Sequence, residues 1–399
     1  MHAITIVQDV LHKGCPHVHS ARLKCLLLAT RAALHASSHT LSNLARALHG
    51  NTAVRHRVKR MDRLLGSRAL QRECASVYAA MARHWLRGND TPLIVVDWTD
   101  LNASRSAQMI RASMALVGRS LTLYEEVHSM KAATTPAVHI AFLTRLRAML
   151  PEGCRPIVIT DAGFRSPWFR AVEAQGWHWV GRSRNRDLVR RHDEPSAQWH
   201  GCKSLYLKAT RTALDLGLFD CVRKRAHVHR LILIKKAPKG RFMPTVNGAR
   251  SRSNHSQKQA RAQAEPWLLG ASTSLAHLSA QAIVAIYTQR IQIEQSFRDT
   301  KNARFGLGLA NSASRTPERL AVLSLIASLA ECVLRLIGQC AINHHLQYDL
   351  QLTNRKKRPE ISVIRVGMLL VDSALGTFNA DEFRRTMQAW AAAHFALRV

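Results

Sequence analysis

Acidic residues are scarce in this chain of 399 residues. Asp and Glu together number 26 against 58 Lys and Arg, so the formal net charge is +32. An excess this large exceeds what solubility requires and indicates a polyanionic partner. A membrane surface is the rival to nucleic acid, but the basic residues are spread along the whole chain and are not gathered on one amphipathic segment. The composition therefore favours nucleic acid.

Other familiar signals are also missing. No charged and then apolar leader stands at residues 1–5, and the longest apolar stretch, 320–337, is interrupted by Glu331 and Arg335. We therefore expect a cytoplasmic protein in which this stretch is a buried helix. No GxxxxGK[ST] loop is present to hold a nucleotide, which excludes a P-loop enzyme, and no internal repeat is visible.

The eight cysteines are scattered and none has CxxC spacing. In a cytoplasmic protein they are expected to be reduced core residues. One segment, HKGCPHVH, places His12, Cys15, His17 and His19 together, but no second cluster completes a tetrahedral zinc site. Surface histidines are the favoured interpretation.

Three regions follow from periodicity and composition. We expect a helical region over residues 1–88, a mixed α/β region over 89–330 with a β-rich insertion at about 185–280, and a helical region over 331–399. Within the first region, 40–66 has the outline of a helix-turn-helix with a basic second helix, although a solvated basic helix is an equal alternative. The basic, Gly- and Ser-rich segment 237–266 is typical of a mobile loop.

Two of the few acids, Asp97 and Asp161, end the two clearest predicted strands. In α/β folds a carboxylate at a strand end lies at the sheet edge where ligands bind. Each is weak evidence alone, because an Asp in this position is more often a turn or cap residue. The nearby acids Asp100, Glu125 and Glu126 are interpreted as structural or facing solvent.

The segment YTQRIQIEQSFRDTK contains a third candidate, Glu294. On one continuous helix, Tyr287, Arg290, Glu294 and Lys301 share an arc of roughly 60°. This arc lies on the side of the helix that carries the apolar residues. The polar residues between them would then face water, among them Gln292, Gln295, Ser296, Asp299 and Thr300. A simple Arg290–Glu294 pair at i, i+4 is the alternative, but it leaves Tyr287 and Lys301 unexplained.

Three convergent carboxylates in a cationic chain suit two Mg²⁺ ions, because hard cations take oxygen ligands. Two such ions can activate a water and stabilise the leaving oxygen of a phosphodiester, while Lys and Arg hold the phosphate backbone. The sequence therefore predicts a metal-dependent nucleic-acid phosphoryl transferase.

The chain resembles the bacterial cut-and-paste transposases with a DDE triad, in the insertion sequence four family. Tyr287, Arg290, Glu294 and Lys301 match the family's Tyr-Arg-Glu-Lys signature at every spacing. The segments VDWTD, ASMALVGRSLTLYEE, TDAGF and RIQIEQSFRDTKNARFGLGL are most similar to the branch that contains the transposase of transposon ten. The resemblance covers most of the chain and is loose in residues 185–260 and in the last fifty.

The resemblance implies an RNase H-like fold with Asp97, Asp161 and Glu294 as catalytic residues that hold two Mg²⁺ ions, or Mn²⁺ as a substitute. It implies excision by nicking, hairpin formation and hairpin opening, followed by strand transfer to target DNA. A structure-specific RNase H-like nuclease and a catalytically decayed DNA-binding protein are the alternatives.

The same resemblance assigns the DNA contacts. Tyr287 and Arg290 would hold a phosphate of the non-transferred strand, and Lys301 would contact the DNA backbone. Trp267 would stack on a flipped base, although a core aromatic is the alternative. The expected partners are DNA with terminal inverted repeats, target DNA and a second copy of the chain, paired through the C-terminal helices, in the nucleoid of the bacterial cytoplasm.

Overall fold

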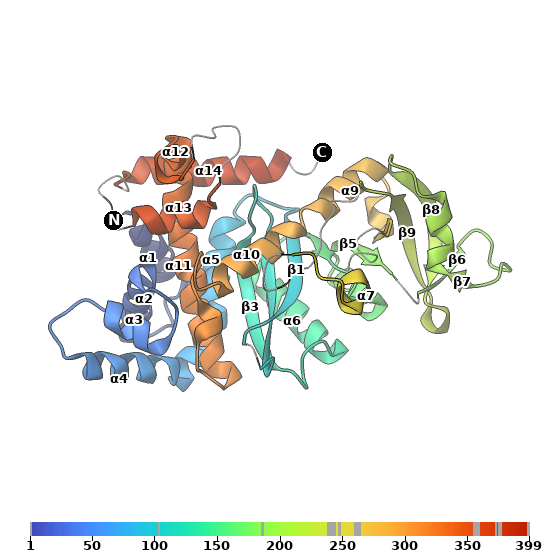
Figure 1. Ribbon diagram of the computed structural model, residues 1–399. Helices are drawn as coiled ribbons and strands as arrows, with labels where there is room; N and C mark the ends of the chain where they lie inside the picture. The colour runs from blue at the N-terminus through green and yellow to red at the C-terminus, as the bar shows by residue number, and fades with distance from the viewer. Residues whose placement is uncertain are drawn as a thin grey trace. The chain divides into compact units, whose positions relative to one another are not determined.

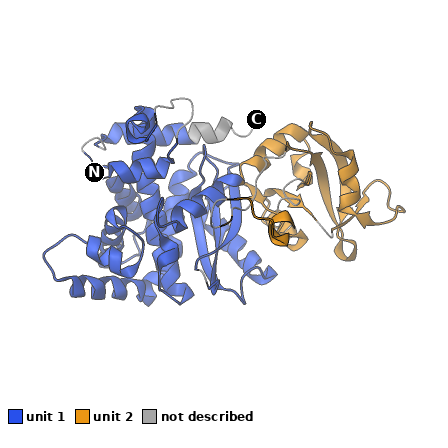
Figure 2. Ribbon diagram, in the orientation of Figure 1, with its two compact units in different colours: residues 1–154, 291–397 blue, residues 155–290, 398–399 orange. Residues whose placement is uncertain are grey.

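The computed structural model describes residues 2–102, 104–184, 187–237, 245, 249–258, 265–353, 360–371, 373 and 377–396. It divides into two compact units, one formed by residues 1–154 and 291–397 and the other by residues 155–290 (Figures 1 and 2). This division does not test the regional boundaries that were predicted at residues 88 and 330.

The first unit begins with five helices, in the region that was predicted to be helical: α1 (His2–Gly14), α2 (Ser20–His35), α3 (Leu41–Ala47), α4 (Val54–Leu65) and α5 (Arg68–Trp85). Hydroxyl side chains begin two of them, since Thr40 accepts the backbone N–H of Asn43 and Ser67 accepts that of Leu70. Helix α4 buries its apolar side and leaves most of its basic side chains exposed.

An antiparallel sheet follows, in the order β3-β2-β1: β1 (Leu93–Asp100), β2 (Ala107–Met114) and β3 (Leu121–Ser129). Its register aligns Asp97 with Arg111 and Arg111 with Glu125, so these three side chains share one face. Asp97 was expected to end its strand, but β1 continues for three more residues. Helix α6 (Pro136–Met149) comes after the sheet.

The long helix α11 (Pro317–Asn343) is the core of this unit. Among the described helices it is the one long and apolar enough to cross a membrane, and 94% of its most apolar window is buried within the protein. The predicted buried helix is therefore confirmed. The other helices in the second segment of this unit, residues 291–397, are α10 (Ile291–Lys301), α12 (Gln347–Leu350), α13 (Val363–Leu370) and α14 (Ala380–Ala396).

Helices α11 and α13 lie in backbone contact. A Cβ added at Gly338 would meet the carbonyl oxygen of Val363 at 1.9 Å, and one at Gly367 would meet that of Leu334 at 2.0 Å. Only glycine fits at either position.

The second unit is a sheet in the order β4-β5-β10-β9-β8-β6-β7. Its strands are β4 (Ile157–Thr160), β5 (His178–Ser183), β6 (Leu188–Arg191), β7 (His200–Gly201), β8 (Leu214–Cys221), β9 (His227–Ile234) and β10 (Trp267–Ala271). Strands β4 and β5 are parallel and are joined by α7 (Ser166–Glu173), while the later strands pair antiparallel. Helix α9 (Ala280–Thr288) closes the unit in sequence.

These elements confirm the mixed α/β class with helical flanks and a β-rich insertion. Antiparallel β1–β3 and the parallel β4–α7–β5 crossover are consistent with an RNase H-like core. Most of the segment 237–266, predicted to be a mobile loop, lies outside the described residues.

The signature segment is not one helix, so the prediction of a continuous helical face is wrong. Helix α9 ends at Thr288 and α10 begins at Ile291. The N–H groups of Gln289 and Arg290 bond to carbonyls three residues back, and the Thr288 hydroxyl donates to the Ala285 carbonyl at 2.6 Å. These bonds tighten the last turn and end the helix. Tyr287 and Arg290 therefore belong to the second unit, and Glu294 and Lys301 to the first.

Candidate active site

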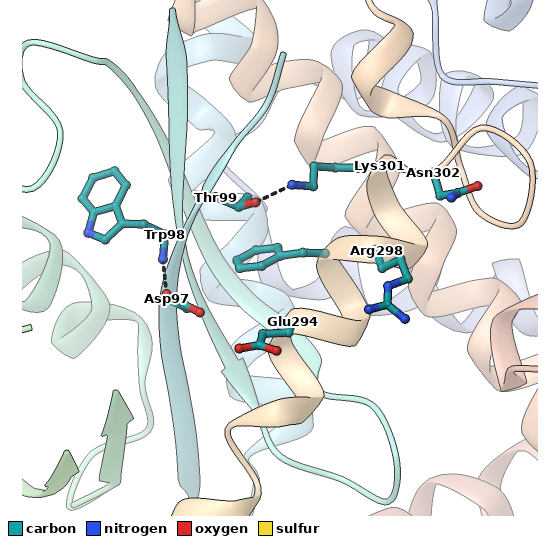
Figure 3. Close-up of a pocket in the computed structure, with 8 residues that line it drawn as sticks. Asp97, Trp98, Thr99, Glu294, Arg298, Lys301 and Asn302 are labelled. Carbon is teal, nitrogen blue, oxygen red and sulfur yellow. Dashed lines mark hydrogen bonds between the residues drawn. The ribbon is translucent and has the colours of Figure 1, made fainter. Parts of the chain in front are cut away.

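Strand β1 and helix α10 line an open cavity of about 440 Å³ in the first unit. Figure 3 shows the carboxylates of Asp97 and Glu294 pointing into the space between the two elements. Asp97 is half-buried and Glu294 is exposed. The lining residues are Asp97, Trp98, Thr99, Glu294, Phe297, Arg298, Lys301 and Asn302. The structure thus brings together two of the three predicted catalytic carboxylates.

The Asp97 carboxylate is oriented by its own strand, because its Oδ1 accepts the backbone N–H of Trp98 at 2.8 Å. The next side chain points to the other face, where Trp98 Nε1 lies 3.1 Å from Nε2 of His139. Burial, helped by the charge of His128, lowers the pKa of His139 to about 4. His139 is therefore neutral at pH 7, and its Nε2 accepts the indole hydrogen.

Lys301 joins the C-terminal end of α10 to β1. Its Nζ donates to Thr99 Oγ1 at 2.6 Å and to the carbonyl of Asp100 at 3.3 Å. Burial lowers the pKa of Lys301, and the nearby carboxylate of Asp100 opposes that shift. The ammonium is thus turned toward the strand that carries Asp97, and its predicted contact with DNA backbone stays a prediction.

The face of α10 that was expected to meet water is buried, so that prediction is wrong. Gln292 is 3% exposed, and its amide donates to the Leu116 carbonyl and accepts the Leu116 N–H. Ser296 donates to the carbonyl of Ser120 at 3.0 Å. Arg119 donates to Asp299 and to Gln295, at 2.5 Å in each case. These polar side chains satisfy the turn between β2 and β3, which explains why they are inside.

A buried ionic network continues from this face. Arg111 is fully buried, pairs with Glu125 and donates to Thr300 of α10 at 3.2 Å. Thr300 donates in turn to Glu331 of α11 at 3.1 Å, and Arg335 donates to Glu331 at 3.3 Å. Burial raises the pKa of Glu331, which nevertheless has two arginines close by.

This network anchors the helix that carries Glu294 to β2, β3 and α11. Sequence reasoning missed it, although a signal was available: Glu331 and Arg335 stand four residues apart in an otherwise apolar helix. Glu125 is structural, as expected, but it is buried and does not face solvent.

Asp161, the third predicted carboxylate, lies in the second unit directly after β4, as predicted. Its Oδ1 accepts the N–H of Gly163 at 2.7 Å. A Cβ at Gly163 would lie 2.9 Å from that oxygen, so the DAG turn requires glycine in order to hold the carboxylate this way.

The predicted DNA contacts of the second unit lie together. The rings of Trp267 and Tyr287 are 5.2 Å apart, and Lys236 Nζ lies 4.6 Å from the centre of the Trp267 ring. Tyr287 is 4% exposed and takes a hydrogen bond from Arg290. Burial raises the pKa of Tyr287, while Arg290 and Arg182 lower it and Asp161 raises it. The charge of Asp161 therefore reaches this group.

Carboxylate oxygens of Asp97 and Glu294 on an open cavity suit a hard divalent cation. In the described part of the chain, no group of three or more His, Cys, Asp or Glu is arranged to hold a metal. In the HKGCPHVH segment, Cys15 is buried and its thiol lies 3.5 Å from the Ser76 carbonyl. Burial raises the pKa of Cys15 to about 11, so the thiol is protonated.

Fold, charge and site together define an enzyme that acts on nucleic-acid phosphodiesters. Residues 88–330 match the family described as the transposase DDE domain. The chain therefore belongs to the DDE transposases, which cut and rejoin DNA, and which generally use divalent metal ions.

The chain was also compared with solved structures and with curated proteins. Among solved structures, the chain is similar to piggyBac transposase in the cryo-EM structure of its synaptic complex with hairpin DNA. The TM-score is 0.41 at 12% identity, over 96% of this chain and 80% of that one. No curated protein matches the sequence.

Proposed function

We propose that this DDE transposase carries out cut-and-paste transposition in the manner of the insertion sequence four family, on the branch of transposon ten. The observation that carries the proposal is the cavity in which Asp97 and Glu294 face each other, with Lys301 bonded to β1 at its edge. The net charge of +32 would attract DNA, the polyanion that such a site would cut.

Asp97, Asp161 and Glu294 would hold the divalent ions, two Mg²⁺ in number or Mn²⁺ as a substitute. When bound, these ions supply an activated water and stabilise the leaving oxygen. The chain's own part is to hold Glu294 rigid through the polar face of α10 and to hold Asp97 and Asp161 through the N–H groups of Trp98 and Gly163.

Four displacements at phosphorus would follow one another. Water breaks the phosphodiester at the element end and frees a 3′-OH. This hydroxyl attacks the opposite strand, forms a hairpin on the element and releases the flanking DNA. Water reopens the hairpin, and the regenerated 3′-OH then attacks a phosphodiester of target DNA. Each step forms one P–O bond and breaks another, so one set of residues serves all four.

The contacts of the second unit support roles in holding the hairpin. Tyr287 and Arg290 would together hold a phosphate of the non-transferred strand. In the first unit, Lys301 would contact the DNA backbone. A flipped base would stack on Trp267 by replacing the Lys236 ammonium over the ring. The partners are terminal inverted repeats, target DNA and a second copy of the chain, in the nucleoid of the bacterial cytoplasm.

A cleavage assay tests the proposal. The substrate carries the inverted repeats that flank the gene, and wild type is compared with Glu294→Gln and with Glu152→Gln, an exposed acid of the same unit. Mg²⁺-dependent hairpin-ended products from wild type and Glu152→Gln, but not from Glu294→Gln, are expected. Nicks that are never joined would favour an RNase H-like nuclease. A specific gel shift without cutting would favour a decayed DNA-binding protein.

A further inference from the structure

A second cavity, of about 570 Å³, lies in the second unit, and none of the predicted site residues lines it. It is formed by the start of α7, the start of β6 and the turn between β8 and β9. Its lining residues are Arg165, Ser166, Pro167, Asp187, Leu188, Val222, Arg223 and Lys224. Nothing in the mechanism above uses them.

Ser166 is the first sign that this cavity receives a ligand. The residue is 5% exposed, and among the described residues its Oγ has no hydrogen-bond partner. A buried hydroxyl without a partner destabilises the free protein, so native structures seldom keep one without a reason. Ser166 is also the first residue of α7, where the helix dipole favours an anion.

Val222 is the second sign, because its backbone is strained. Its φ is +67°, a region that a β-branched residue rarely enters. Its N–H donates to the Leu188 carbonyl at 2.9 Å, and its carbonyl accepts the N–H of Arg225 at 3.1 Å. These two bonds fix the strained residue and place Arg223 and Lys224 on the cavity wall. Strain of this kind is concentrated at functional sites.

The charge of the wall selects the ligand. Arg165, Arg223 and Lys224 are opposed by one carboxyl, that of Asp187. Burial raises the pKa of Asp187, and the charge of Arg165 opposes that shift. The lining is therefore positive in either protonation state of Asp187, which fits a small anion.

We propose that this cavity anchors a backbone phosphate of the bound DNA, with Ser166 Oγ and the side chains of Arg165, Arg223 and Lys224 as donors. The proposal rests on the proposed function. Ser166 follows Asp161 by five residues, so its Cα lies within ~17 Å of that of Asp161. At 3.4 Å per nucleotide of one strand, that span is about five nucleotides. The site would thus fix the DNA strand a few nucleotides from the phosphate that reacts.

Salt dependence of DNA binding provides the first test. Arg223→Gln/Lys224→Gln is compared with the charge-matched control Lys131→Gln/Arg155→Gln, whose residues are exposed; Arg155 precedes β4 at the end opposite Asp161. Binding of a 30-base-pair duplex is measured in EDTA. Each lost phosphate contact lowers the slope of log K against log salt by ~0.9, so the double variant should lose up to ~1.8 and bind ~10- to 60-fold more weakly at 0.1 M salt. A loss equal to that of the control would overturn the proposal.

Two single variants separate a ligand site from a structural one. Ser166→Ala should weaken duplex binding several-fold without lowering Tm, because the free protein gains by losing an unpaired hydroxyl. Asp187→Asn should tighten binding. A lower Tm with unchanged binding in Ser166→Ala, or weaker binding in Asp187→Asn, would refute the assignment.

Two controls keep the outcomes distinct. Inorganic phosphate should compete only at concentrations that also act as general salt; full competition at low concentration would mean a free-phosphate site and would overturn the DNA assignment. Because binding is measured without metal, a wild type that binds but never cuts would refute the transposase proposal while leaving this site supported.

Discussion

Replacing Arg119 with alanine should weaken the support of the helix that carries Glu294. Arg119 donates to Asp299 and to Gln295 at 2.5 Å, and the side chains of Arg119 and Asp299 are 20% and 8% exposed. Breaking a buried ion pair from one side costs about 3–5 kcal/mol, because the remaining charge stays buried without its partner. Partial exposure of Arg119 reduces this, so we expect a loss of about 2–4 kcal/mol in the free energy of unfolding.

Equilibrium urea unfolding measures the effect, with Arg87→Ala as a control at an exposed arginine. The double variant Arg119→Ala/Asp299→Asn should recover part of the loss, since it removes the stranded charge as well. In the cleavage assay, Arg119→Ala should cut more slowly while binding DNA normally, because it disturbs the position of Glu294 and not the DNA surface. If Arg119→Ala were no less stable than Arg87→Ala, the idea that this face of α10 is held by the turn would be wrong.

Three further predictions concern Lys301, Gly163 and His139. Lys301→Met should lower the cleavage rate about 100-fold with a smaller effect on DNA affinity, because it removes the bridge from α10 to β1; equal losses in rate and affinity would assign Lys301 to phosphate contact alone. Gly163→Ala should displace the Asp161 carboxylate and abolish Mg²⁺-dependent cutting, whereas Gly201→Ala, where an added Cβ has no neighbour within 4 Å, should cut normally. The pKa of His139 is lowered to about 4 by burial, so the folded protein keeps this ring neutral while the unfolded chain takes up a proton near pH 6.5. Its contribution is therefore full above pH 6.5 and is lost as the pH falls toward 4, by at most ~3 kcal/mol; urea unfolding at pH 7 and pH 4.5 should show a smaller pH effect in His139→Gln than in wild type.

The sequence predicted the positions of the carboxylates better than the shape of the segment that carries one of them. Strand patterns place Asp97 on β1 and Asp161 directly after β4, because apolar runs identify buried strands without knowledge of partners. They do not predict that β1 continues for three residues beyond Asp97. The two residues between Thr288 and Ile291 are neither Gly nor Pro, so the sequence contains no signal that the helix ends there. A helical wheel assumes continuity, and its angles fail once the last turn of α9 tightens.

The prediction that the polar face of α10 meets water failed for a different reason. Gln292, Ser296 and Asp299 look like water-facing residues because composition cannot reveal which groups will pair with them. Their partners are backbone groups and an arginine in a turn more than 170 residues earlier. Likewise, Glu331 and Arg335 exclude a membrane span from sequence alone, but their bonds to Thr300 and to the Arg119 carbonyl come only from the tertiary structure.

The two facing glycines of α11 and α13 give the C-terminal region a mechanical role. Because Gly338 and Gly367 bring the two backbones into contact, no compressible side-chain layer separates the helices there. A displacement of α13 is therefore passed directly to α11, and Glu331 on α11 is bonded to Thr300 on α10. A displacement of the C-terminal helices would thus be transmitted through α11 to α10, the helix that carries Glu294.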